Sequence, residues 1–233
     1  MSQSKEPNGF QVLSKTWVAD KPSHSGRVRY GFNHLRIDQG EDTSAIVDLR
    51  SGDFTMVVHA RKAFTTLSID QMKAQRAAMR ARAKAEIDRM PPKTRDVLIA
   101  QMQAQDEAMM RPAKVEVGST TRTVAGHPCR VTTWTSPQDQ GRACLRVTPP
   151  IDTTAFRADA RAFAQRLSQA NLGTGALALP LIILAPHGFP ARIEQASQFG
   201  PTRIETKTDY FDWKAIVFKK DAFAPPKGYR KLR

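Results

Sequence analysis

The hydrophobic and polar positions follow two different periods along the chain. Val28, Tyr30 and Phe32 alternate with polar residues, as expected for β-strands that bury one face, and residues 46–49, 54–58 and 62–67 also have strand-like patterns. The alternation slips by one residue near Asn33 and His34, which predicts a β-bulge there. Arg-Ser-Gly-Asp at 50–53 separates two apolar runs and predicts a hairpin turn. The first third of the chain is therefore predicted to consist of strands.

The period changes to that of a helix at Ser68. Ser68 and Gln71 fit a capping box, in which each side chain satisfies a backbone N–H at the start of a helix. Pro91 and Pro92 must end this helix, and a second helix is expected over 93–110. The sequence thus predicts a helical hairpin at 69–110, inserted into a sheet protein. The apolar stripe of its first helix contains Met72, Met79, Ala83, Ile87 and Met90.

Strand patterns return at 114–124, 129–134 and 142–147, and a third helix follows. Its expected inner face is formed by Phe156, Ala160, Phe163 and Leu167. The apolar run at 176–185 is too short to cross a membrane, and we interpret it as a buried element.

Three final strands are expected at 189–196, 202–211 and 213–218. The predicted fold class is α+β: a curved antiparallel sheet on which the inserted helical hairpin and the third helix pack. We expect one domain over 9–229, a flexible start at 1–8 and a basic tail at 230–233.

The charge balance adds a possible function. The 233 residues contain 36 Lys and Arg against 22 Asp and Glu, a net charge of +14, which attracts anionic lipid or nucleic acid but says nothing of the fold. The basic stretch at 73–95 has three readings: a solvated outer face, a surface for anionic lipid or lipopolysaccharide, or a nucleic-acid site. The last is disfavoured, because no aromatic residue is interleaved for base stacking. The expected anion-binding residues are Arg76, Arg80, Arg82, Lys84 and Arg89.

The methionines suggest a second kind of site. Methionine side chains are flexible and adapt to irregular apolar surfaces, so over a curved sheet they could line a pocket for an acyl chain. The alternative is that they are ordinary core. The candidate ligand-binding residues are Met72, Met79, Met102, Tyr30 and Phe32.

The two cysteines, Cys129 and Cys144, either form one disulfide or are buried free thiols. A regular hairpin turning at 137–141 would not place them directly opposite each other. No Cys-x-x-Cys, metal-ligand array, phosphate loop or nucleophile elbow is present, so we expect no catalytic residue, metal or cofactor. An enzyme remains the third reading, with His59, Tyr30 and Arg146 as scattered candidates.

Several short motifs carry a family resemblance. Ala125-Gly126-His127-Pro128-Cys129, together with Gly188-Phe189-Pro190 and the closing Phe223 to Tyr229, resembles a bacterial secreted or periplasmic family of unknown function with an Ala-Gly-x-x-Cys turn. The resemblance implies a curved antiparallel sheet wrapped around helices, similar to the lipoprotein-carrier fold.

This resemblance leads to the functional expectation. The protein is expected to be non-enzymatic and periplasmic or secreted, although residues 1–6 contain no signal-peptide core, which leaves a cytoplasmic protein as the alternative. It would bind an apolar or lipidic ligand, or a partner in the envelope. The alternative function is an interaction module in which the basic helix at 69–90 docks an acidic protein.

Overall fold

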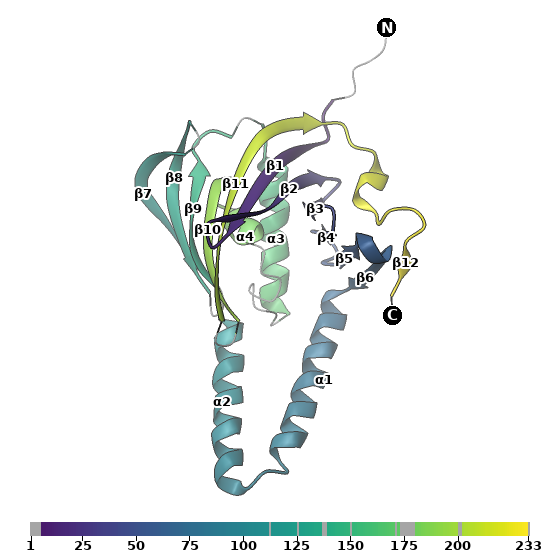
Figure 1. Ribbon diagram of the computed structural model, residues 1–233, viewed down its shortest axis with the longest axis vertical. Helices are drawn as coiled ribbons and strands as arrows, with labels where there is room; N and C mark the ends of the chain where they lie inside the picture. Colours follow the sequence, from purple (N-terminus) through teal and green to yellow (C-terminus); the bar gives the residue numbers. More distant parts are fainter. Residues whose placement is uncertain are drawn as a thin grey trace.

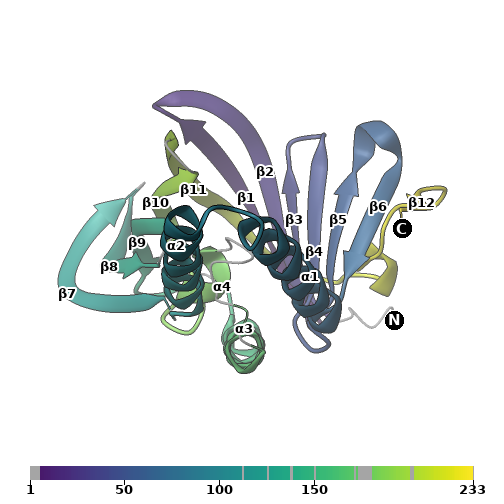
Figure 2. The same cartoon turned by 90° about the horizontal axis from the view of Figure 1, so that it is seen from below.

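The computed structural model describes residues 6–111, 113–124, 126–136, 139–149, 151–170, 172, 180–199 and 202–232. The fold is mixed α+β, and its described strands form one large, curved, unclosed sheet (Figures 1 and 2). All neighbouring strands are antiparallel except the last pair. The strand order across the sheet is β12-β6-β5-β4-β3-β2-β1-β11-β10-β9-β8-β7.

The first six strands form the predicted meander. Their bounds are β1 (Gly9–Val18), β2 (Lys21–Gly31), β3 (His34–Gln39), β4 (Thr43–Asp48), β5 (Phe54–Val58) and β6 (Ala63–Leu67). Gly52 has a φ of 87° in the β4–β5 turn, as expected. The predicted bulge near Asn33 is wrong. Phe32 and Asn33 instead have φ values of 51° and 62°, which make a tight hairpin turn between β2 and β3.

The inserted hairpin consists of α1 (Ile69–Ile87) and α2 (Pro92–Met110), and its capping box at Ser68 and Gln71 is confirmed. The expectation that this hairpin packs on the sheet is wrong. Both helices project away from the sheet (Figure 1), and α1 contains no fully buried residue. Only the first turn of α1, with Ile69 and Met72, packs against the core. Beyond Met72, charged residues are interspersed mainly with alanines, and Met79 and Ile87 are the large apolar residues that remain, so docking the rest of α1 on the sheet would bury little apolar area. We call residues 69–110 the helical arm.

The second half of the chain completes the sheet from its other edge. Its strands are β7 (Lys114–Val124), β8 (His127–Thr135), β9 (Asp139–Arg146), β10 (Pro190–Phe199) and β11 (Thr202–Ile216). β11 pairs with β1 and so joins the two halves. The two strands expected at 202–211 and 213–218 form this one strand, because Asp212 takes a positive φ of 51° at a register shift and lets the pairing continue.

The core lies between the concave face of the sheet and α3 (Thr154–Gln169). The predicted inner face of α3 is confirmed, since Phe156, Ala160, Phe163 and Leu167 are all buried. Phe156 packs edge-on against Phe10 of β1, with ring centroids 5.6 Å apart. The short helix α4 (Pro180–Leu184) is also buried, as expected for the apolar run, whose residues 176–179 lie outside the described residues.

The C-terminal segment crosses the outer face of the sheet, opposite α3. It contains a 3₁₀ turn, η3 (Lys220–Phe223), and the short strand β12 (Arg230–Lys231), which pairs with β6. Arg36 of β3 holds this segment by donating hydrogen bonds to the carbonyl oxygens of Ala222 and Ala224. Two residues expected in a basic tail are therefore part of the sheet.

Candidate functional site

The helical arm is the first candidate site, and ion pairs between its two helices define its shape. Arg80 of α1 lies 2.7 Å from Asp106 of α2, and Arg76 lies 3.4 Å from the same carboxylate. Lys84 pairs with Asp88 at 2.7 Å, one helical turn further on. Three of the five predicted anion-binding residues are therefore engaged within the arm.

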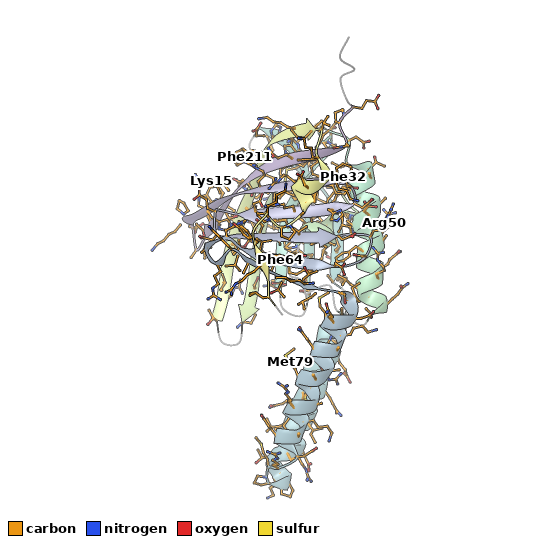
Figure 3. The ribbon with its side chains drawn as sticks, turned by 90° about the vertical axis from the view of Figure 1, so that its right-hand side faces the viewer. Lys15, Phe32, Arg50, Phe64, Met79 and Phe211 are labelled. Carbon is orange, nitrogen blue, oxygen red and sulfur yellow. A yellow bond between two sulfur atoms is a disulfide. The ribbon has the colours of Figure 1, made fainter. Side chains whose placement is uncertain are left out.

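Four further cations of the arm are exposed to solvent: Lys73, Arg82, Arg89 and Lys93. No carboxylate of the described residues pairs with Lys73, Arg82, Arg89 or Lys93. Large apolar side chains are exposed beside them: Met79 (64% exposed), Val97 (56%) and Met90 (39%). Figure 3 shows Met79 partway along α1, below the sheet. The arm therefore presents cations and flexible apolar side chains together, a combination that suits an anionic, partly apolar surface.

The five predicted ligand-binding residues do not gather in one place. Met72 is half-buried at the base of the arm and Met102 is half-buried on α2, whereas Met79 is exposed. Tyr30 is buried, and its hydroxyl donates a 2.7 Å hydrogen bond to Asp159 of α3. Burial, followed by this hydrogen bond, raises the pKa of Tyr30 well above its usual value. Phe32 lies in the β2–β3 turn against Phe223, on the outer side.

The concave face of the sheet is filled with aromatic side chains where it meets α3. Phe189 contacts Phe10, Tyr210 and Trp213, with ring centroids 5.7, 5.7 and 4.3 Å apart. Leu35, Val47 and Leu49 extend the same cluster towards β4. Because side chains pack closely here, this region gives no support to the predicted pocket for an acyl chain. Binding of an apolar ligand stays a prediction.

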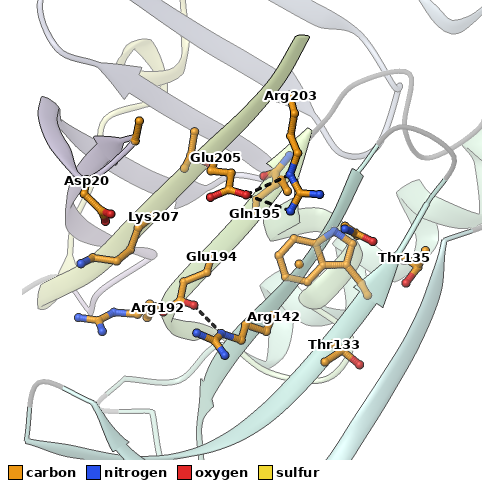
Figure 4. A pocket seen from close by; sticks show the side chains of 16 residues that line it. Asp20, Thr133, Thr135, Arg142, Arg192, Glu194, Gln195, Arg203, Glu205 and Lys207 are labelled. Carbon is orange, nitrogen blue, oxygen red and sulfur yellow. Dashed lines mark hydrogen bonds and ion pairs between the residues drawn. The ribbon is translucent and has the colours of Figure 1, made fainter. Parts of the chain in front are cut away.

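A hollow of about 720 Å³ lies beside β8, β9, β10 and β11 (Figure 4). Asp20, at the tip of the β1–β2 hairpin, forms one wall. Ion pairs run along the trough: Arg142 lies 2.5 Å from Glu194, and Arg203 lies 2.9 Å from Glu205. We call it the outer trough. The sequence does not identify the residues of this trough. The alternating charges of β11 predict which face of the sheet is exposed to solvent, but they do not predict where that face is concave.

A buried polar network lies under the C-terminal segment. Ser44 donates a 2.7 Å hydrogen bond to Asp38, and His59 Nε2 lies 2.8 Å from Ser44 Oγ. Burial alone would raise the pKa of Asp38, but hydrogen bonds from Arg36 and Ser44, with nearby arginine charges, lower it below its usual value. The serine, histidine and aspartate resemble a catalytic set only in composition, since Ser44 has no exposed surface. The network therefore holds the sheet and gives no support to an enzyme.

The disulfide between Cys129 and Cys144 is present, with a Cα–Cα distance of 5.2 Å. In the β8–β9 pair, Cys129 is opposite Arg146 and Cys144 is opposite Val131, so the bridge runs diagonally between neighbouring strands. Among the described residues, no group of three His, Cys, Asp or Glu side chains could hold a metal ion. No helix in the described part of the chain is long and apolar enough to span a bilayer.

Comparisons with known proteins give only distant structural similarity. No protein-family model matches the sequence, and no curated protein matches it either. An uncharacterised conserved protein from Thermus thermophilus has 6% identity and a TM-score of 0.47, over 97% of this chain and 91% of the other. A structure of PNGF-II has 5% identity and a TM-score of 0.45 over 97% of this chain, which spans only 31% of that protein. A DUF1329 family protein from Desulfovibrio piger has 8% identity and a TM-score of 0.32, over 93% and 89% of the two chains. The chain is thus assigned to none of these families.

Proposed function

We propose that this is a non-enzymatic protein of the bacterial envelope that binds an anionic lipid surface through its helical arm. The observation that carries the proposal is the coexistence of exposed methionines and of cations that no described carboxylate pairs with, on an element that projects from the sheet. The disulfide supports an oxidising compartment, because such bonds rarely persist in the cytosol.

A bilayer fits the arm better than a protein partner does. The unpaired cations do not share one helix face: Lys73 and Arg82 are nine residues apart on α1, which places them on opposite sides. A folded partner would need a single coherent face. The α1–α2 connection forms the tip of the arm (Figure 1), and Arg89, Met90 and Lys93 lie in or next to it. A membrane that meets the arm at this tip can contact every side of it at once, whereas Lys73, near the base of the arm, does not take part.

The expected affinity is modest and depends on salt. Each Lys or Arg near an anionic membrane contributes about 1 kcal/mol, so Arg82, Arg89 and Lys93 together contribute about 3 kcal/mol. That corresponds to roughly a hundredfold in affinity at low ionic strength. Exposed charges are screened within about 10 Å at 0.1 M salt, so binding should weaken as salt rises.

The test is flotation with vesicles that contain phosphatidylglycerol, compared with vesicles of phosphatidylcholine alone. The protein should float with the anionic vesicles only, and the R82Q/R89Q/K93Q variant should lose most of this binding. A K219Q/K220Q/K227Q variant removes the same charge from the exposed C-terminal segment and should bind like the wild type. Equal binding to both kinds of vesicle, or loss in the control variant alone, would contradict the proposal.

The acidic-protein reading makes a different prediction in the same experiment. Arg76 and Arg80 bind Asp106, so replacing them would disturb the arm itself and could not identify a docking surface. The R82Q/R89Q/K93Q variant avoids this problem. If the wild-type protein ignores anionic vesicles, the lipid proposal fails and the acidic-partner reading takes its place.

A further inference from the structure

A row of basic side chains crosses the outer face of the sheet. None of these residues belongs to the helical arm. Cross-strand pairing places these residues on one face, since Lys207 is opposite Glu194 and Trp17, and Glu194 is opposite Arg142. Neighbouring strands are about 4.8 Å apart, so a row from β7 to β2 is roughly 30 Å long. Its cations, in strand order, are Arg122, Arg142, Arg192, Lys207, Lys15 and Arg27.

The row has a hollow along part of its length. Arg142, Arg192 and Lys207 line the outer trough, and a smaller hollow of about 190 Å³ continues from Arg142 and Arg192 to Arg122. The outer face is therefore indented where the cations lie, as an extended ligand requires.

Some of these cations are held in place and others are unneutralised. Arg142 pairs with Glu194, and Arg192 pairs with Asp209, each at 2.5 Å. In contrast, no carboxylate within the described ranges pairs with Arg122, Lys207, Lys15 or Arg27. The fixed pairs align the row, and the unneutralised cations give it a positive excess.

The side chains between the charges are suited to hydroxyl groups. Thr133 and Gln140 line the trough with donors and acceptors, and Glu194 and Glu205 offer carboxylate oxygens that accept hydrogen bonds. Those carboxylates would repel a ligand with a charge on every unit. They would bind the hydroxyls of a chain whose negative charges are spaced apart.

The aromatic residues of this face argue against a nucleic acid. The ammonium groups of Lys15 and Lys207 lie over the Trp17 ring, 5.4 and 4.9 Å from its centroid, and occupy the surface on which a base would stack. Phe211 is 42% exposed near Lys15 (Figure 3), and a single ring makes a poor stacking platform.

We infer that the outer face from β7 to β2 binds a linear acidic polysaccharide, a chain that carries both hydroxyl groups and spaced carboxylates or sulfates. The row of cations meets the acidic groups, and the trough holds the sugar units between them. This site is separate from the arm and does not depend on it.

The experiment measures binding of fluorescent hyaluronate and of unsulfated chondroitin, in which every second sugar carries a carboxylate, by fluorescence anisotropy, with neutral dextran, polyphosphate and single-stranded DNA as comparisons. Both acidic polysaccharides should bind, and dextran should not. Three cation contacts at a solvent-accessible surface together contribute about tenfold to affinity, so R122Q/K15Q/K207Q should weaken polysaccharide binding by about that factor. The K219Q/K220Q/K227Q variant, which loses the same charge, should bind like the wild type.

Three outcomes would overturn the inference. One is unchanged affinity in the R122Q/K15Q/K207Q variant, and another is a loss in R82Q/R89Q/K93Q instead, which would assign the polysaccharide to the arm. The third is binding of polyphosphate or DNA as tight as that of the polysaccharides, which would mean that the outer face binds any polyanion and does not select a polysaccharide. Arg122 and Lys15 are exposed, Lys207 is half-buried, and none of the three has a carboxylate partner among the described residues, so the variant should fold.

Discussion

His59 joins the sheet to the C-terminal segment through Tyr229: the imidazole Nδ1 lies 3.1 Å from the Tyr229 hydroxyl. On its other side, His59 Nε2 faces Ser44, whose hydroxyl proton is donated to Asp38. Ser44 can therefore only accept from the ring, so in neutral His59 the proton is on Nε2 and Tyr229 donates to Nδ1. One ring thus fixes β4 and the last residues of the chain together.

Replacing Tyr229 with Phe tests this connection. The ring contact with His59, at a centroid distance of 5.7 Å, would remain, and the hydrogen bond would be lost. We expect the free energy of unfolding to fall by about 1 kcal/mol, the net worth of a typical hydrogen bond. Urea denaturation monitored by tryptophan fluorescence gives the value. An unchanged midpoint would mean that Tyr229 holds the segment by packing alone.

Asp38 makes stability sensitive to acid. Its pKa is lowered in the folded protein, so the folded state favours the ionised form more than the unfolded chain does. The resulting stability is fully present above the unfolded aspartate pKa of about 3.9 and is lost as the pH falls through the folded pKa. Asp38→Asn should remove this part of the pH dependence. It should also lower the free energy of unfolding at neutral pH by about 3 kcal/mol, because Arg36 is left buried without its carboxylate partner.

The measurement for Asp38 is a set of denaturation curves between neutral pH and pH 3. The wild type should lose stability more steeply than the variant at the acid end. Parallel curves for the two proteins would show that other carboxylates control the acid response.

The disulfide should contribute substantially to stability. Closing a loop of about 15 residues is worth about 3 kcal/mol in the chain-entropy account, so C129S/C144S should be less stable by roughly that amount. Thermal unfolding of the wild type with and without reductant provides the same comparison without mutation. If neither treatment lowers the melting temperature, the sheet does not depend on the bridge.

The arm should respond to mutation independently of the sheet. Asp106→Asn removes the carboxylate that Arg76 and Arg80 bind, and so breaks two ion pairs that link the two helices. Hydrogen exchange should accelerate in α1 and α2 while the amides of β1 and β11 keep their protection. Faster exchange in the strands as well would mean that the arm and the sheet unfold as one unit.

The sequence predicts elements better than their placement. The capping box at Ser68 and the inner face of α3 are local patterns, and both are confirmed. The direction of the arm is not determined by a local pattern. The sequence of the methionine stripe is the same whether the stripe covers the sheet or faces solvent. Only the tertiary structure shows that Met72 packs against the core while Met79 does not.

The same distinction applies to the candidate sites. Basic residues at 73–95 are visible in the sequence, but Asp106, which neutralises two of them, is about 30 residues away along the chain and is brought close by the hairpin. The outer trough depends on the register of four strands, β8 to β11, and on the position of the β1–β2 hairpin, which no short stretch of sequence encodes. The diagonal disulfide also follows from that register, which places Cys129 opposite Arg146.

The most direct test of the central claim is an environment-sensitive fluorophore at the tip of the arm. Met90→Cys and, as a control on the β1–β2 hairpin, Ser23→Cys each provide one labelling position in an exposed site. With phosphatidylglycerol vesicles, the label at position 90 should shift to shorter wavelength and brighten, while the label at position 23 should not change. No response at position 90, or equal responses at both positions, would contradict binding of the arm to an anionic membrane.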